Sequence, residues 1–171
     1  MLNAIPINDF AARAHDLWAN QWLLLTAGDF PAGRYNTMTV GWGAFGTMWG
    51  KPLAMVVVRP TRYTFEFMNA YDTFTLCAFP ASFRPALQLL GTKSGRDGNK
   101  IAAAKLTPCA ASRVAAPAFA EANLVVECRK SYWQDLEPGN FLDPATAGLY
   151  PQKDYHRVYF GEILAVGGET P

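Results

Sequence analysis

Apolar residues in this chain occur in short runs that are separated by residues typical of turns. Six of these segments are rich in β-branched and aromatic residues, which is typical of strands. They are residues 22–27, 36–42, 53–59, 74–79, 123–128 and 155–166. Pro60 ends the third strand because it lacks an N–H for the ladder, and Gly161 indicates a bulge in the last one.

The segments whose apolar residues are spaced as in a helix are shorter than the predicted strands, and their pattern is weaker. A helix is expected within residues 7–18, with Phe10, Ala14 and Leu17 on one face. A second helix is expected over residues 62–69 with Thr64 as its cap. A third would place Phe83, Leu87 and Leu90 on one face and end at Gly91, before a polar, glycine-rich loop to Lys100 and one or two helical turns over residues 101–105.

The strands do not alternate with helices, so a parallel sheet is not expected. The sequence predicts a mainly β fold, a closed or nearly closed antiparallel barrel with Greek-key connections and a few short helices. The length of 171 residues fits a single domain over residues 1–171. Half of the residues are hydrophobic and only 17% are charged, which favours a homodimer that covers part of the surface.

Charge and cysteine content narrow the function. The net charge is +1 with no basic stripe, which argues against a nucleic-acid partner. The longest apolar run is far shorter than the roughly 20 residues of a membrane span, and no secretory signal is recognisable. Cys77, Cys109 and Cys128 are odd in number and far apart, and the two histidines are isolated. We therefore expect reduced thiols, a cytoplasmic location and no metal site.

One segment matches the sequence pattern of a dinucleotide-binding motif but lacks the structural context that the motif needs. Residues 41–46 read GWGAFG, which matches GxGxxG, but residues 47–52 (TMWGKP) cannot form the helix that this motif requires. No P-loop and no nucleophile elbow are present in the sequence.

Three polar segments carry the candidate chemistry: residues 36–39 (NTMT), 59–64 (RPTRYT) and 92–97 (TKSGRD). Each segment alone is more often an ordinary strand or a solvated loop. Together they offer hydroxyls, backbone donors and cations for a phosphate, close in sequence to the flat side chain of Trp42. This combination suits a phosphorylated aromatic cofactor.

The chain resembles the flavin reductase-like family, the FMN-binding split barrels that include the flavoredoxins. The resemblance runs in order over nearly the whole chain after about residue 20. The matching stretches are residues 36–52 (NTMTVGWGAFGTMWGKP), 56–68 (VVVRPTRYTFEFM), 74–80 (FTLCAFP), 89–100 (LLGTKSGRDGNK), 124–130 (LVVECRK) and 154–163 (DYHRVYFGEI).

The resemblance implies a homodimer of split barrels with FMN near the subunit interface, and it implies roles for matching residues. Asn36, Thr37, Met38 and Thr39 would line the edge of the flavin ring, beside Gly41 and Trp42. Arg59, Thr61, Arg62, Tyr63 and Thr64 would face the phosphate and ribityl chain. Lys93, Ser94 and Gly95 would close over the cofactor, and His156 would lie on a strand near the flavin face.

Two positions depart from the family pattern. Many relatives carry serine where this chain has Gly41, which removes one hydroxyl or lets the backbone approach the cofactor more closely. Gly98 and Asn99 stand where relatives tend to be more acidic.

Three functions remain open from the sequence. In the first, the protein is a flavin reductase in which NADH or NADPH passes a hydride to flavin N5, with no protein acid or base required and His156 as a candidate catalytic residue. In the second, it is an electron carrier with tightly bound FMN that exchanges electrons with a protein acceptor. In the third, the barrel has lost the flavin or binds another ligand. The choice of NADH or NADPH, of FMN or FAD, and of electron acceptor is not encoded in a recognisable motif.

Overall fold

The protein is described by a computed structural model that covers residues 2–168. An eight-stranded antiparallel sheet runs through these residues in the order β3-β2-β6-β9-β10-β5-β4, with β1 paired to the far end of β10. Its strands are β1 Asn3–Ile5, β2 Leu23–Asp29, β3 Arg34–Val40, β4 Gly43–Met48, β5 Lys51–Val58, β6 Thr73–Ala78, β9 Leu124–Asp135 and β10 Arg157–Gly168. The short strands β7 Pro108–Cys109 and β8 Ala118–Phe119 form a separate pair.

The sheet curls into an open barrel. Its two edge strands, β3 and β4, are consecutive in the chain and are joined only by Gly41 and Trp42. Two strands at opposite edges of a seven-strand path can be this close only if the sheet bends round on itself. The barrel is therefore split between β3 and β4, and the chain crosses the split at Gly41 and Trp42.

The barrel interior is filled by apolar side chains of alternating strand positions. Leu23, Leu25, Phe74, Leu76 and Val56 are fully buried in this main cluster. A second cluster packs the outer face of the sheet against the helices, through residues such as Leu24, Cys77, Leu87 and Leu90.

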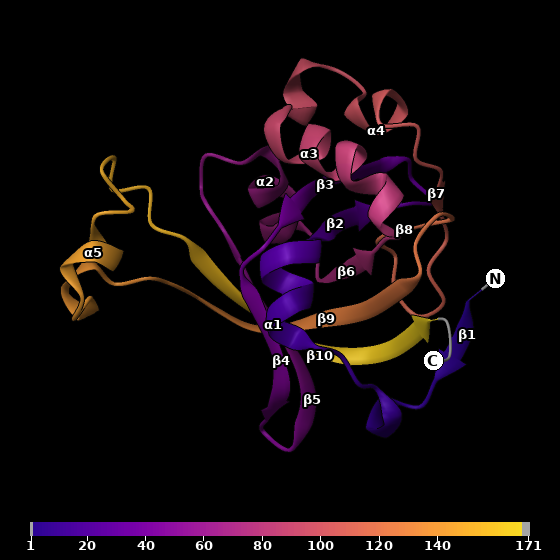
Figure 1. The fold of residues 1–171 in the computed structure, drawn as a ribbon, viewed down its shortest axis with the longest axis horizontal. Helices are drawn as coiled ribbons and strands as arrows, with labels where there is room; N and C mark the ends of the chain where they lie inside the picture. The colour runs from indigo at the N-terminus through magenta and orange to yellow at the C-terminus, as the bar shows by residue number, and fades with distance from the viewer. Residues whose placement is uncertain (1, 169–171) are drawn as a thin grey trace.

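The helices are α1 Ala14–Asp16, α2 Tyr63–Ala70, α3 Arg84–Thr92, α4 Lys100–Ala103 and α5 Pro144–Ala147. Figure 1 shows α2, α3 and α4 together at one end of the barrel, whereas α5 lies away from the barrel to one side. A five-residue π-helical turn, Leu17–Gln21, continues α1, and single 3-10 turns lie at Ile7–Asp9, Ala81–Phe83, Gly95–Asp97 and Pro138–Asn140. No helix within residues 2–168 is long and apolar enough to cross a membrane.

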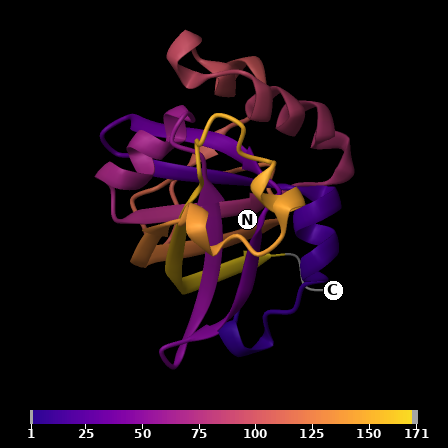
Figure 2. The ribbon, with the colours of Figure 1, turned by 90° about the vertical axis from the view of Figure 1, so that its left-hand side faces the viewer.

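Residues 130–135 of β9 extend past β6 and pair with the start of β10, which pairs with β5 on its other side. Residues 136–156 connect the two strands and carry α5, and we call this segment the excursion. It projects to one side of the barrel in Figure 1 and lies in front of the barrel in Figure 2.

All six predicted strands are present, but their bounds and number differ from the prediction. The β9–β10 register shifts next to Gly161, between Phe160 and Gly161, but the extra residue there is Ser131 of β9; the residue that bulges from β10 is Leu164 and not the predicted Gly161. A Cβ on Gly161 would lie 2.6 Å from the ring of Phe74, so this position admits no side chain. The prediction missed β4, whose residues are mostly exposed and therefore lack an apolar run.

Three helix predictions were wrong in detail. Residues 7–18 do not form one helix, because Phe10 is extended and packs edge-on against Phe45 at 5.3 Å. Thr64 does not cap α2; Arg62 occupies the N-cap position without a side-chain bond. Gly91 does not end α3, which runs on through Thr92.

Candidate functional site

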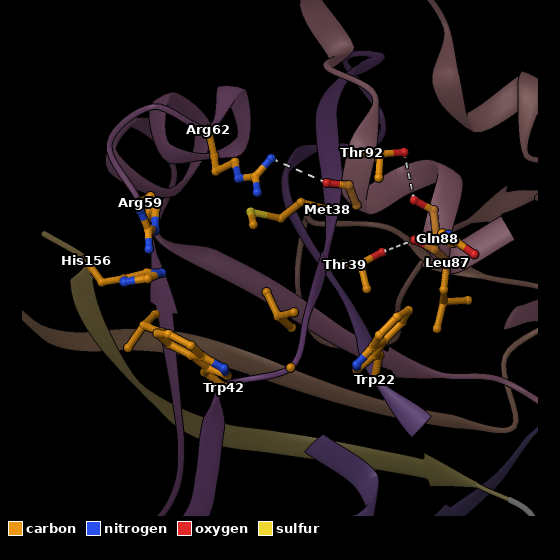
Figure 3. Close-up of a pocket in the computed structure, with 14 residues that line it drawn as sticks. Trp22, Met38, Thr39, Trp42, Arg59, Arg62, Leu87, Gln88, Thr92 and His156 are labelled. Atoms are coloured by element: carbon orange, nitrogen blue, oxygen red, sulfur yellow. Dashed lines mark hydrogen bonds between the residues drawn. The ribbon is translucent and has the colours of Figure 1, made fainter. Parts of the chain in front are cut away.

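A cavity of about 490 Å³ opens at the split of the barrel (Figure 3). The end of β3, the end of β5, the start of α2, the last turns of α3 and the start of β10 all contribute to it. Its volume is in the range of small-molecule sites, about 300–1,000 Å³. It is lined by Trp22, Met38, Thr39, Val40, Gly41, Trp42, Val57, Arg59, Arg62, Leu87, Gln88, Gly91, Thr92 and His156.

One end of the cavity is a flat aromatic wall. Trp42 is 50% exposed, and its ring centroid lies 5.1 Å from that of His156. A large apolar ring that remains half in solvent offers a surface on which a planar ligand can pack. At the other side of the cavity, the ring of Trp22 is covered by the guanidinium of Arg84, 3.1 Å from the ring centroid.

The backbone approaches the cavity closely at two glycines. A Cβ on Gly41 would lie 3.2 Å from both the carbonyl oxygen of Trp18 and the Trp22 ring. A Cβ on Gly91 would lie 3.1 Å from the Thr39 side chain, whose hydroxyl donates to the Leu87 carbonyl at 2.5 Å. This hydrogen bond joins β3 to α3, and both elements contribute residues to the wall of the cavity.

Two arginines reach the cavity, and their surroundings differ. Arg59 Nη1 donates to Asp154 Oδ2 at 2.8 Å, and its Nη2 donates to the Leu149 carbonyl at 3.0 Å. Arg62 is exposed, makes no ion pair within residues 2–168, and donates only a long 3.4 Å bond to the Gly91 carbonyl. Arg62 is therefore the arginine with donors left for an anion.

His156 is neutral at physiological pH. Burial and the neighbouring Arg59 charge lower its pKa to about 4, although Asp154 opposes the shift. Its Nδ1 shares a hydrogen bond of 2.8 Å with the Tyr150 hydroxyl. The imidazole thus presents an uncharged ring to the cavity beside Trp42.

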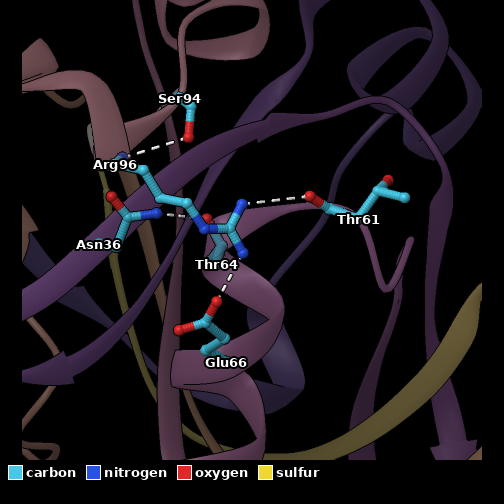
Figure 4. Close-up of polar contacts among 6 residues, drawn as sticks. All are labelled: Asn36, Thr61, Thr64, Glu66, Ser94 and Arg96. Carbon is cyan, nitrogen blue, oxygen red and sulfur yellow. Dashed lines mark hydrogen bonds and ion pairs between the residues drawn. The ribbon is translucent and has the colours of Figure 1, made fainter.

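A polar cluster lies next to the cavity, where α2 begins (Figure 4). Asn36 Nδ2 donates to the Thr64 hydroxyl at 2.7 Å, and both side chains are buried. The Arg96 guanidinium donates to Glu66 at 2.5 Å and to the Thr61 carbonyl at 3.4 Å, while the Arg96 N–H donates to Ser94 Oγ at 3.1 Å. These contacts fix the loop after α3 to the first turn of α2.

The structure brings about half of the predicted site residues to the main cavity: Met38, Thr39, Gly41, Trp42, Arg59, Arg62 and His156. Asn36, Tyr63 and Gly95 line a neighbouring polar cavity of about 430 Å³. Thr37 and Thr64 are buried, and the Thr37 hydroxyl donates to the Leu25 carbonyl inside the barrel. Thr61, Lys93 and Ser94 lie on the chain around these cavities without lining either of them.

Sequence reasoning missed several residues that support the site. Lys100 is buried, and its ammonium donates to the carbonyls of Leu90 and Lys93, both at 3.0 Å. Burial and the nearby Arg62 lower the pKa of Lys100 to about 8. Its position at the end of a polar loop gave no signal of burial. Tyr150 and Asp154 were also missed, because nothing in their spacing connects them to a strand about 90 residues earlier.

Comparison with solved structures defines the class of fold. An FMN-binding domain of a flavin reductase-like enzyme from Shewanella baltica aligns with TM-score 0.68 and 18% identity over 97% of this chain and 76% of its own. The flavoredoxin of Desulfovibrio vulgaris aligns with TM-score 0.68 and 20% identity (93% and 74%). The NADH:FAD oxidoreductase of Streptomyces globisporus aligns with TM-score 0.67 and 15% identity (87% and 75%). The fold is thus that of the split-barrel flavin reductases.

The family follows from the sequence itself. Residues 17–170 match the model of the flavin reductase like domain, and the chain belongs to this family. The predicted family and the predicted fold class are confirmed. No curated protein matches the chain significantly.

Proposed function

We propose that the protein binds FMN in the cavity at the barrel split and uses it as an NAD(P)H-dependent flavin reductase. The observation that carries the proposal is the combination of a flat, half-exposed Trp42 with an exposed Arg62 that has no ion pair among the described residues 2–168 (Figure 3). A planar ring system with a phosphate at one end needs both features. The donor set therefore fits FMN.

Each part of the wall has a role in this proposal. Arg62 would neutralise the phosphate, with Thr61, Lys93 and Ser94 near that end, while Asn36, Tyr63, Thr64 and Gly95 form the supporting cluster behind it. Met38, Thr39 and the Gly41 backbone would line the ring edge, and Thr37 would support them from inside the barrel. Bound FMN would supply the redox chemistry, accepting hydride at N5.

The exposed face of Trp42 and the neutral His156 would receive the nicotinamide. An uncharged imidazole avoids repulsion with the positive charge of an oxidised nicotinamide, and no proton has to be moved by the protein. The similarity to an NADH:FAD oxidoreductase supports a nicotinamide donor and also makes FAD an alternative flavin.

An electron carrier is the second candidate. Its support is the similarity to flavoredoxins from Desulfovibrio vulgaris and Methanosarcina acetivorans, at 20% and 23% identity. In this case FMN remains bound, and an electron acceptor protein takes the place of the nicotinamide.

The proposal includes a cytoplasmic homodimer of single-domain subunits. Its support is an aromatic patch formed by Trp49 of the β4–β5 hairpin, Tyr132 of β9 and Phe160 of β10, with ring centroids 5.8–6.3 Å apart. Trp49 and Tyr132 are 56% and 47% exposed, which is unusual for large aromatic side chains outside an interface.

The test is an absorption spectrum of the purified protein followed by anaerobic addition of NADH and of NADPH. Bleaching of bound flavin by either nucleotide supports the reductase and identifies the donor. Bleaching by dithionite alone favours the carrier, and a protein that takes up neither FMN nor FAD contradicts both.

Arg62→Gln should weaken FMN binding at least about tenfold, because it removes a charge-assisted bond. Arg113→Gln, at an exposed position outside the cavity, should not.

A further inference from the structure

Arg59 is the cavity arginine whose donors are already used. Its two terminal nitrogens donate to Asp154 and to the Leu149 carbonyl, and its guanidinium lies 5.0 Å from the centroid of the Tyr150 ring. All three partners belong to the excursion, more than 85 residues away in the chain. The contact therefore joins the end of β5 to a segment that otherwise leaves the barrel.

The charge of Arg59 is balanced by its partner. The hydrogen bond and charge of Arg59 lower the pKa of Asp154, so the carboxylate is ionised at neutral pH. The exposed fraction of the two side chains is only 27% and 12%, which strengthens the pair compared with one on the open surface. A phosphate would have to compete with this pair for Arg59, whereas Arg62 offers its donors without such competition.

The excursion holds together around aromatic rings. Phe141, Tyr150 and Tyr155 pack with ring centroids 5.1–5.9 Å apart, and Arg59 lies against this cluster. The Tyr150 hydroxyl then reaches back to Nδ1 of His156, and the His156 ring packs on Trp42. A continuous set of contacts thus leads from Arg59 through Tyr150 and His156 to Trp42.

We infer that Arg59 is a positioning residue that anchors the excursion at the cavity mouth and, through Tyr150, holds His156 against Trp42. This inference rests on the proposed function in one respect: it assigns the excursion to the face where the nicotinamide donor binds. Arg59 then determines the affinity for the nucleotide and not for the flavin phosphate. Within the excursion, Tyr150 and Asp154 are the residues through which Arg59 sets the specificity of the site.

Two variants each remove one partner of the ion pair between Arg59 and Asp154. Arg59→Met and Asp154→Ala should each speed amide hydrogen exchange across residues 140–153 at least about tenfold, because each breaks a charged hydrogen bond. Both should raise KM for the nucleotide about tenfold or more, with kcat and the Kd for FMN within about threefold of the parent. Tyr150→Phe removes only the link to His156 and should raise KM without speeding exchange.

The matched controls separate positioning from general damage. Arg59→Lys can still pair with Asp154 but cannot also reach the Leu149 carbonyl, so it should fall between Arg59→Met and the parent. Lys153→Gln changes an exposed residue of the excursion and should leave exchange and kinetics unchanged.

The inference is overturned if the excursion keeps its protection in Arg59→Met and Asp154→Ala. It is also overturned if Arg59→Met weakens FMN binding tenfold while Asp154→Ala does not, since Arg59 would then be a phosphate ligand. Failure of the proposed function has a different signature. If the parent protein binds no flavin or oxidises no nucleotide, hydrogen exchange of the flavin-free variants still shows whether Arg59 anchors the excursion.

Discussion

His156 is 9% exposed, and its environment holds it neutral well below its ordinary titration range. Its pKa is about 4 in the fold and near 6.5 in the unfolded chain. Between these values the unfolded chain binds more protons, so stability rises with pH across this window and is lost as the pH falls. The contribution is up to about 3 kcal/mol and is fully present above pH 6.5.

Two variants test this pH dependence of the free energy of unfolding. His156→Gln should lose less stability than the parent between pH 7.5 and pH 4.5, as measured by urea unfolding at both values. His15→Gln, at the other histidine, which is exposed, should follow the parent. Equal pH dependence in His156→Gln and the parent would mean that folding does not lower the pKa of His156.

Gly43 is confined by its neighbours in a way that Gly46, on the same strand, is not. A Cβ on Gly43 would lie 2.4 Å from the Trp18 ring and 2.6 Å from the Met55 carbonyl, whereas a Cβ on Gly46 meets nothing within 4 Å. Gly43→Ala should therefore lower the free energy of unfolding by about 1–3 kcal/mol, and Gly46→Ala should not lower it. Urea unfolding of both variants tests this, and equal stability would contradict the tight packing of Trp18 on β4.

At the residue scale, the sequence predicts which segments form the site better than it predicts which atoms face the cavity. The NTMT segment is on β3 as expected, but Asn36 and Thr37 are buried while Met38 and Thr39 line the cavity. The hydroxyl of Thr37 is used inside the barrel by Thr26 and by the Leu25 carbonyl. Only the three-dimensional partners decide this, since strand alternation fixes the period and not the direction.

At the scale of elements, Arg96 joins two segments that the proposed cofactor needs together. Its guanidinium spans from the 3-10 turn Gly95–Asp97 to Glu66 on α2 and the Thr61 carbonyl, and it lies 4.8 Å from the Tyr63 ring centroid (Figure 4). Gly95 packs so closely on Asn36 that a Cβ there would lie 2.2 Å from its Oδ1. The protein's own contacts thus hold this loop against α2.

Removing this clamp should loosen the site without removing a ligand-facing group. Arg96→Ala should raise the Kd for FMN about three- to tenfold and speed hydrogen exchange over residues 93–98, because the loop must then be ordered on binding. Flavin fluorescence quenching measures the Kd. Arg113→Ala is the control for loss of an exposed arginine elsewhere. An unchanged Kd in Arg96→Ala would place the phosphate away from this loop.

The elements that the sequence did not predict are those whose residues do not form an apolar run or an alternating apolar pattern. Residues 131–135 (SYWQD) extend β9 past its pairing with β6 although all five are exposed, because residues 132–135 pair with β10. The pairing of Arg59 with Asp154 depends on the excursion, which follows this extension of β9 and returns the chain to the cavity. Local periodicity describes what is buried in a strand, and these contacts are made by long-range pairing instead.

At the scale of the whole molecule, the topology places the cavity where the barrel fails to close. Most core strands pair on both sides, whereas β3 and β4 each have one free edge beside Gly41 and Trp42 within the described chain. A split at this point gives a ligand access to backbone groups and to the aromatic wall without interrupting the core. The sequence predicted the barrel from the number and spacing of strands, but not the location of its opening, which depends on the order of pairing.

The aromatic patch of Trp49, Tyr132 and Phe160 lies where the β4–β5 hairpin meets β9 and β10. If a second copy covers this patch, a charge placed in it must be desolvated at the interface, which costs several kcal/mol when it is unpaired. Trp49→Glu should therefore shift the protein from dimer to monomer in sedimentation velocity at micromolar concentration.

Ala102→Glu is the matched control for this prediction. It adds the same charge to an exposed position on α4, which lies at the other end of the molecule from the β4–β5 hairpin that carries Trp49 (Figures 1 and 2). This variant should keep the mass of the parent. The prediction that the aromatic patch forms a dimer interface is contradicted if the parent already sediments as a monomer or if the Trp49→Glu variant remains a dimer. If the Trp49→Glu monomer still binds FMN with unchanged affinity, the cavity of one subunit is sufficient for the flavin.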